Sequence, residues 1–158
     1  MPVTIRLAHP SDADAIHQLT LDAYMADRDR LHPPSGVFKE TVEDVRRAIE
    51  QDGVYVAEID RAMVGTARVR PDEVDTSAMY CGRVAVSPSE QRRGIGTALM
   101  KCVERHARES GFDAVTLGVR IELPENMRFY LKRGYRIVRE EAHPGHTTPT
   151  FVWMRKDL

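Results

Sequence analysis

The sequence has little cysteine, a single tryptophan and almost no excess of charge of either sign. Its two cysteines, Cys81 and Cys102, are too few and too isolated for a disulfide framework or a zinc site, which excludes a disulfide-rich secreted scaffold. Cys102 falls on the apolar face of an expected helix and is assigned to the core. A formal net charge of −1 provides no general attraction to nucleic acid or to an anionic membrane surface. We therefore expect neither nucleic acid nor a membrane as partner.

Long apolar runs, internal repeats and low-complexity segments are missing as well. No stretch approaches the ~20 apolar residues that span a bilayer, and the N-terminus lacks the apolar core of a signal peptide. A cytoplasmic protein is therefore expected. What the chain does contain is ordinary for a globular protein: 158 residues, 42% of them hydrophobic and 30% charged. This length predicts a single domain over 1–158 that is large enough to bury a core.

Hydrophobic patterning predicts an α+β fold. Strands are expected where apolar residues alternate or run together between turn signals, at 3–7, 54–59, 63–69, 79–86, 114–119, 135–139 and 150–154. Helices are signalled by caps and helical spacing at Pro10-Ser11-Asp12, Thr41-Val42-Glu43-Asp44, Gly94 to Thr97 and Pro124 to Arg133. The stretch from Arg28 to Lys39 is expected to be a loop or a broken helix, the kind of segment in which acceptor specificity tends to reside.

The most informative stretch runs from Val84 to Thr97. It starts as a short apolar strand, turns at a proline, passes Arg92 and Arg93, and opens a helix at Gly94-Ile95-Gly96. Glycine lets the backbone approach a ligand without a Cβ in the way. The first turn of the helix adds unpaired N–H groups and the positive end of the helix dipole, which together bind anions. The stretch therefore predicts a phosphate or pyrophosphate site.

This stretch differs from two common phosphate loops. A Walker loop ends in Gly-Lys-Ser/Thr, whereas here Gly96 is followed directly by Thr97. A dinucleotide fingerprint has a third Gly or Ala where this chain has Leu99. The hexapeptide Gln91-Arg92-Arg93-Gly94-Ile95-Gly96 instead resembles the Gln/Arg-x-x-Gly-x-Gly/Ala signature of the GCN5-related N-acetyltransferases (GNAT), together with the preceding Val-x-Val-x-Pro and the following apolar helix. The alternative is a glycine-rich turn beside a solvated basic patch.

The resemblance extends along nearly the whole chain and implies a GNAT-type fold, a mixed, mostly antiparallel central sheet flanked by helices on both faces. It implies acetyl-CoA as co-substrate and direct attack on the thioester by a primary amine of a small molecule or peptide. The backbone of Val84, Ala85 and Val86 would bind the pantetheine arm, with the Val86 N–H near the acetyl oxygen. The amides that would cradle the pyrophosphate, with the Thr97 hydroxyl as a further donor, are those of Arg92, Arg93, Gly94, Ile95, Gly96 and Thr97.

A second segment, from Leu123 to Tyr135, resembles the late helix of the family. Tyr130 matches the tyrosine often proposed as the general acid for the leaving thiolate, and an ordinary tyrosine pKa near 10 keeps it protonated at neutral pH. The alternative for this ring is packing on the sheet. Asn126 matches an asparagine that faces the cofactor, although it stands one helical turn before the tyrosine where the family has about two. It either reaches the pantetheine arm or is a polar residue of the first turn.

No motif identifies the group that takes the proton from the amine. Where many family members place a glutamate, on the strand leading into the motif, this chain has Met79-Tyr80-Cys81-Gly82. Glu122, just past the next strand, is the nearest alternative, followed by Glu73, His143 and His146. Each of them also fits an ordinary solvated residue. The two histidines have no metal-ligand partners at a suitable spacing, so no metal is expected.

The acceptor is not determined by the sequence. Acidic residues at 22, 27, 29 and 72–75 would attract a cationic amine, whereas Arg68, Arg70 and Arg120 would hold the carboxylate of an amino-acid-like acceptor. Trp153, in the last expected strand, fits either core packing or a homodimer interface. For the whole protein, the alternative is a catalytically degenerate acyl-CoA-binding regulatory module, and a more distant one is a nucleotide-phosphate binder. The missing glutamate favours the degenerate module, and Tyr130 favours the enzyme.

Overall fold

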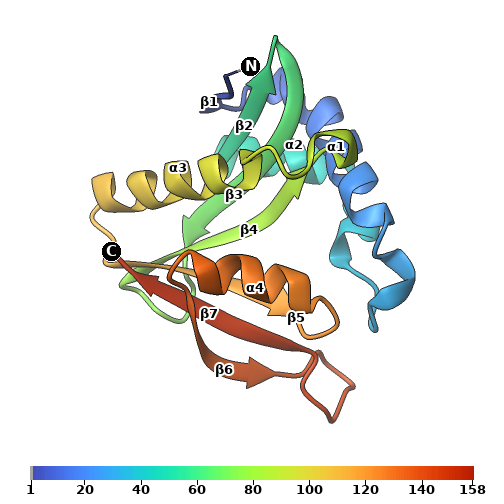
Figure 1. Cartoon of the computed structure of the whole chain (residues 1–158), viewed down its shortest axis with the longest axis vertical. Helices are drawn as coiled ribbons and strands as arrows, with labels where there is room; N and C mark the ends of the chain where they lie inside the picture. Colours follow the sequence, from blue (N-terminus) through green and yellow to red (C-terminus); the bar gives the residue numbers. More distant parts are fainter. Residues whose placement is uncertain (1) are drawn as a thin grey trace.

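The computed structural model describes residues 2–158 and is built on a seven-stranded sheet with the order β1-β2-β3-β4-β5-β7-β6 (Figure 1). Every neighbouring pair of strands is antiparallel except β4 and β5, which run parallel. The strands are β1 (Thr4–Leu7), β2 (Gly53–Ile59), β3 (Ala62–Pro71), β4 (Ala78–Val86), β5 (Ala114–Arg120), β6 (Arg136–Glu141) and β7 (Phe151–Asp157). The helices are α1 (Ala13–Met25), α2 (Val42–Gln51), α3 (Ile95–Glu109) and α4 (Pro124–Lys132).

Helices cover both faces of this sheet (Figure 1). On one face, Ile16 of α1 and Val45 of α2 pack with Val56 of β2. On the other face, Leu99 of α3 packs in a larger core that includes Leu117 of β5, and α4 packs against β5 beside it. The predicted α+β class, with a mixed and mostly antiparallel sheet between helices, is thereby confirmed.

Local sequence accounts for several of the element boundaries. The Thr41 hydroxyl accepts a hydrogen bond from the Asp44 N–H (3.1 Å), and the Asp44 carboxylate accepts one from the Thr41 N–H (2.9 Å). This reciprocal capping box begins α2. Asp60 and Arg61, which join β2 to β3, both have positive φ values (51° and 68°), as a tight two-residue hairpin turn requires.

The longest helix, α3, has 15 residues and is buried along one side only. Within residues 2–158, no helix combines the length and the apolar character that crossing a membrane would require. The stretch from Arg28 to Lys39, expected to be irregular, contains the short 3-10 helices Arg28–Arg30 and Gly36–Lys39. Leu31 and Gly36 of this stretch line the cavity described next.

Candidate functional site

The sheet opens between its two parallel strands. β4 and β5 pair only over Ala78–Tyr80 and Ala114–Thr116. Beyond that point β4 continues to Val86 and keeps its pairing with β3 on the other edge. Among the residues that the structure describes, the edge of β4 that faces the opening therefore has no strand partner from Cys81 onward. Free N–H and C=O groups on such an edge can bind an extended ligand as an added strand is bound.

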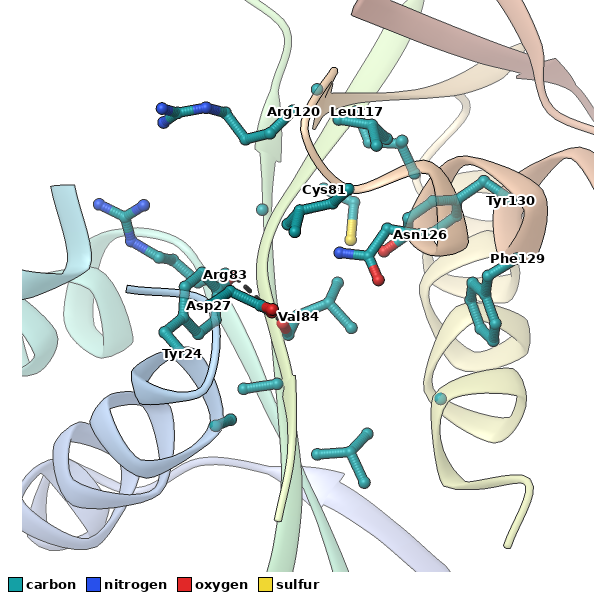
Figure 2. Close-up of a pocket in the computed structure, with 18 of the residues that line it drawn as sticks. Tyr24, Asp27, Cys81, Arg83, Val84, Leu117, Arg120, Asn126, Phe129 and Tyr130 are labelled. Atoms are coloured by element: carbon teal, nitrogen blue, oxygen red, sulfur yellow. Dashed lines mark hydrogen bonds between the residues drawn. The ribbon is translucent and has the colours of Figure 1, made fainter. Parts of the chain in front are cut away.

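A cavity of about 920 Å³ occupies this opening (Figure 2). Its walls come from β4, the first turn of α3, α4, the ends of β5 and β7, the end of α1 and the stretch that follows α1. Of the predicted site residues, all of them described by the structure, Arg93 and Glu122 lie outside the cavity wall. Those that line it are Val84, Ala85, Val86, Arg92, Gly94, Ile95, Gly96, Thr97, Asn126 and Tyr130.

A β-bulge in β4 shapes one wall of the cavity. The β3–β4 register shifts between Thr66 and Arg68, and Arg83 opposite has a φ of +50°, which non-glycine residues rarely adopt. The Val84 carbonyl accepts a hydrogen bond from the Tyr24 hydroxyl of α1 (3.2 Å; Figure 2). Burial raises the pKa of Tyr24 to about 12, so its phenol remains a donor. Helix α1 thus holds the part of β4 whose backbone faces the opening.

The first turn of α3 presents unpaired N–H groups to the cavity. Gly94, at the N-cap position, has a φ of +77°, a conformation that suits glycine, and no side chain caps the helix there. Arg92, just before it, lines the cavity and also has a positive φ (+68°). The amides at the start of α3 therefore combine with the helix dipole and a guanidinium group, which is the arrangement expected of an anion site.

Helix α4 packs against this turn through residues that the sequence did not single out. The Arg133 guanidinium donates through Nε to the Thr97 hydroxyl oxygen (3.0 Å) and lies 3.6 Å from the centroid of the Phe129 ring. Its positive charge is added to the anion site, and the Thr97 O–H proton is left for a ligand. A Cβ on Gly96 would lie 3.2 Å from the Phe129 ring. Glycine at this position therefore permits the close approach of α4.

Tyr130 is positioned by the way α4 ends. Its carbonyl accepts the Tyr135 N–H (3.1 Å), and the Leu131 carbonyl accepts the N–H of Gly134 (3.1 Å), whose φ is +93°. This Schellman motif brings the Tyr130 and Tyr135 rings together edge to face, with centroids 5.7 Å apart. Burial raises the pKa of Tyr130 well above its usual value, so the hydroxyl stays protonated. The predicted acid thus has its proton and a fixed position.

Asn126 and Tyr130 point from α4 toward β4 (Figure 2). Residues four apart lie on the same face of a helix, so the one-turn spacing is sufficient to bring both to one cavity. Cys81 faces them from β4 (Figure 2). Burial raises the pKa of the Cys81 thiol to about 12, which leaves it un-ionised and unsuited to act as a nucleophile.

Glu122, in the turn between β5 and α4, is hydrogen bonded to the segment that precedes α2. Its Oε2 accepts the His32 N–H (2.9 Å), and its Oε1 lies 3.6 Å from Nε of Arg120. Arg30 donates to the Glu122 carbonyl (2.9 Å) and to the Glu125 carboxylate (2.6 Å). Although partial burial opposes ionisation, the His32 N–H and the Arg120 charge hold the pKa of Glu122 below its usual value. These partners make Glu122 a weaker base than a free carboxylate.

Of the other candidate bases, all within the described residues, His143 is the one that lines the cavity. Its backbone N–H and its ring Nδ1 are both hydrogen bonded to the Thr150 hydroxyl. Burial and the neighbouring Arg120 charge lower the pKa of His143, so the imidazole is neutral at pH 7. Glu73 is exposed and pairs with Arg70 (3.2 Å). No three His, Cys, Asp or Glu side chains among residues 2–158 are arranged to hold a metal ion.

Arginines expected to hold an acceptor carboxylate already have partners in the protein. Arg68 donates to both oxygens of Glu40 (2.8 and 2.5 Å), and Nε of Arg83 lies 3.4 Å from the same carboxylate. Although burial opposes ionisation, the hydrogen bonds and charge of Arg68, followed by those of Arg83, hold the pKa of Glu40 below its usual value. Arg120 donates to the carbonyl of Pro33. This cluster joins the segment before α2 to β3 and β4.

Solved acetyltransferases share this fold. The PaiA N-acetyltransferase from Thermoplasma acidophilum, in complex with coenzyme A, superposes with a TM-score of 0.83 at 16% identity over 100% of both chains. An N-acetyltransferase from Staphylococcus aureus gives 0.76 at 16% identity over 99% of both chains. The ribosomal-protein-alanine N-acetyltransferase from Brucella melitensis gives 0.75 at 19% identity over 98% of this chain and 99% of that one. No curated protein matches the sequence.

The split sheet and the uncapped turn of α3 define a protein of the acetyltransferase class. The family model described as "Acetyltransferase (GNAT) family" matches residues 14–135, which is most of the chain. The protein therefore belongs to the GNAT family of acetyltransferases, and the resemblance first drawn from Gln91 to Gly96 is confirmed.

Proposed function

We propose that this protein is an acetyl-CoA-dependent N-acetyltransferase that acts on a primary amine of a small molecule or peptide. One observation carries the proposal. The unpaired edge of β4, the uncapped turn of α3 and the Tyr130 hydroxyl all border a single cavity. A free strand edge can bind an extended amide-containing arm, an uncapped helix turn can bind a pyrophosphate, and a hydroxyl can protonate the sulfur that leaves a thioester.

The residues fit acetyl-CoA, which when bound would supply the activated acetyl group as a thioester. Backbone groups of Val84, Ala85 and Val86 would hold the pantetheine arm, with the Val86 N–H directed at the acetyl oxygen. The amides of 92–97 would hold the pyrophosphate, supported by the charge of Arg133 beside Thr97. Arg93, whose side chain pairs with Glu90 (3.3 Å), would contribute its backbone N–H.

Acetyl transfer forms an amide C–N bond and breaks the C–S bond, while the nitrogen loses one proton and the sulfur gains one. Tyr130 is assigned as the donor of the proton to sulfur, because burial keeps its hydroxyl protonated. Asn126, one turn earlier, is assigned to the pantetheine arm. The raised pKa of Cys81 disfavours a covalent acetyl-cysteine intermediate. Direct attack by the amine is therefore the simpler route.

Two residues are candidates for accepting the amine proton. His143 lines the cavity and is neutral at pH 7, which a base requires. Glu122, predicted from the sequence, lies outside the cavity wall with its carboxylate hydrogen bonded to His32, so it would act through an intervening water. We place His143 ahead of Glu122 in this role. The homodimer interface and the cytoplasmic location remain predictions.

A panel of primary amines incubated with acetyl-CoA tests the proposal. We expect amine-dependent release of the free CoA thiol and an acetylated amine detected by mass spectrometry. The alternative, a catalytically degenerate acyl-CoA-binding module, predicts that CoA binds but that no amine is acetylated. It is favoured by β4 itself, where the stretch Met79-Tyr80-Cys81-Gly82 contains no carboxylate. A nucleotide-phosphate binder would instead be stabilised by ATP.

A further inference from the structure

Aromatic side chains gather on one side of the opening in the sheet. Along β7, Val152 and Met154 are buried in the core with α3, so the alternating Phe151 and Trp153 face the opposite side. Gly118 of β5 pairs with Trp153 in the strand register. We call the group formed by Tyr80, Gly118, Phe151 and Trp153 the aromatic patch. All four residues line the cavity that also contains Val84 and Tyr130.

In the aromatic patch, Gly118 lies among the rings and leaves the backbone of β5 uncovered. The Phe151 and Trp153 centroids are 5.4 Å apart, and those of Trp153 and Tyr80 are 5.9 Å apart, both edge to face. Between them Gly118 is exposed and has no side chain. A Cβ added there would lie 3.6 Å from the Phe151 ring and 4.0 Å from the Trp153 ring, which is ordinary contact. Space that a side chain would fill is therefore open to a flat group.

The rings also have contacts within the protein, since Trp153 Nε1 donates to the Glu141 carboxylate (3.1 Å) and the Phe151 ring lies 4.9 Å from the His143 ring. Trp153, expected in the core or at a homodimer interface, is half-buried and borders the cavity. The helices on this face of the sheet, α1 and α2, pack on β2, β3 and β4. Half-buried aromatic rings that line a reaction cavity are typical of a binding site, because rings offer large contact area at small entropic cost.

The acidic residues of the cavity do not favour a polycationic acceptor. Asp27 and Glu125 both line the cavity, but Arg30 donates to each of them (2.9 and 2.6 Å). Their negative charge is therefore already shared with a guanidinium group, and no carboxylate pair is left for the second ammonium of a polyamine. The guanidinium groups of Arg70 and Arg139 lie over the Tyr80 and Trp153 rings, 4.6 and 5.1 Å from their centroids. Both arginines line a neighbouring cavity, whereas Tyr80 and Trp153 also line the cavity that contains Gly118.

We propose that the aromatic patch binds a planar aromatic ring of the acceptor, so that the substrates are arylalkylamines with a short linker between ring and nitrogen. The inference rests on the proposed function, since it places the ring relative to the acetyl group. Gly118 lies two residues beyond the last β4–β5 pair. Val84 lies four residues beyond it, but the bulge at Arg83 adds one residue to β4, so Val84 is at the level of the third position beyond that pair. The two levels therefore differ by about one residue, roughly 3 Å along the strands. A linker of two or three atoms between ring and nitrogen keeps both at these neighbouring levels.

Three amines of different shape test this inference: 2-phenylethylamine, 2-cyclohexylethylamine and spermidine. The first two have the same reach and similar apolar area, but only the first is flat. We expect kcat/KM for 2-phenylethylamine to exceed that for 2-cyclohexylethylamine by about three- to tenfold, and that for spermidine by more. Equal values for the two ring amines, or a preference for spermidine, would overturn the proposal.

Gly118→Leu places a side chain in the space beside the Phe151 and Trp153 rings and does not alter the start of α3. We expect it to lower kcat/KM for 2-phenylethylamine at least about tenfold while the KM for acetyl-CoA stays unchanged. Gly118→Ala, whose Cβ makes only ordinary contacts, serves if the leucine variant does not fold. Phe151→Leu should also lower kcat/KM, and Phe151→Tyr, which keeps the ring, should restore it. Wild-type values in Gly118→Leu and Phe151→Leu would contradict the assignment.

A binding measurement separates failure of this inference from failure of the proposed function. Isothermal titration calorimetry of 2-phenylethylamine with the CoA-bound protein should show binding to wild type and none to Gly118→Leu. Binding of this kind without acetylation of any amine would refute the enzyme and leave the aromatic patch as a ligand site. Acetylation of other amines with no binding of 2-phenylethylamine would refute the patch alone.

Discussion

Tyr130 keeps its proton because burial, above all, makes the phenolate unfavourable. Tyr130→Phe removes this donor and preserves the ring that packs on Tyr135. We therefore expect kcat to fall about 100-fold, while the KM for acetyl-CoA and the melting midpoint remain close to wild type. Steady-state kinetics across a range of acetyl-CoA concentrations provide the measurement. A variant with wild-type kcat would leave Tyr130 with a packing role only.

If His143 is the base, the value of kcat/KM is expected to decrease at acidic pH as the imidazole becomes protonated. Its pKa lies below the ordinary value of about 6.5, and the neutral imidazole is the form that accepts a proton. The value of kcat/KM should therefore rise as pH increases through that pKa and level off above it. In His143→Gln we expect this decrease to disappear and the rate to drop about 100-fold.

Glu122→Gln is the matched comparison, for which the sequence predicts a loss of rate that is partly rescued at high pH. A profile for Glu122→Gln that matches wild type, beside an altered one for His143→Gln, would assign the base to His143. The reverse pattern would return the role to Glu122.

Glu40 links the stability of the protein to pH. Its pKa is lower in the folded protein than the ordinary value of about 4.3, so its contribution is present above that value and is lost as pH falls through the folded pKa. Glu40→Gln leaves Arg68 without its charged partner. We expect the free energy of unfolding at pH 7 to fall by about 3 kcal/mol, with less change between pH 5 and pH 3 than in wild type.

Urea unfolding at several pH values measures this effect. Glu43→Gln is the control, because Glu43 pairs with Arg46 on the exposed side of α2, where an ion pair contributes little. Equal losses in the two variants would contradict the special role of Glu40.

At the scale of the element, a side chain at the start of α3 tests the anion site, because a Cβ on Gly96 would lie 3.2 Å from the Phe129 ring. Gly96→Val puts a branched side chain against Phe129 and in front of the unpaired N–H groups. We expect CoA binding to be abolished while the fold is largely retained. Isothermal titration with CoA measures the affinity, and Lys101→Val, at an exposed position of the same helix, carries the same β-branched helix penalty. Unchanged CoA affinity in Gly96→Val would contradict the proposal that the start of α3 binds the pyrophosphate.

At the scale of the whole molecule, cofactor binding should stabilise the fold. A ligand at 100 times its dissociation constant adds about 2.7 kcal/mol to the free energy of unfolding, which for a chain of this size raises Tm by roughly 5–10 °C. We expect acetyl-CoA and CoA to produce this shift and ATP to produce none. Thermal melting with the three ligands side by side is the measurement. A shift with ATP but with neither CoA species would favour a nucleotide-phosphate site instead.

Features of the fold and the site that depend on local chain chemistry were predictable from the sequence. The helix and strand pattern, the glycine at the start of α3 and the glycine that ends α4 follow from hydrophobic spacing and from positions that require a positive φ. The stretch from Gln91 to Gly96 identified the family for the same reason, because its signature consists of consecutive residues of the chain. Asn126 reaches the cavity through helical periodicity alone.

Only the tertiary structure decided which side chains have partners and which remain free. Arg133 meets Thr97 across 36 positions of sequence, and Glu122 is engaged by the backbone of His32 across 90. Neither contact can be predicted from the periodicity or the composition of the sequence. The opening between β4 and β5, and the aromatic patch beside it, arise where paired strands separate. The sequence by itself therefore determined the elements and the uncapped turn at the start of α3, which are local. The surroundings of the cavity depend on contacts between distant segments that exist only in the folded chain.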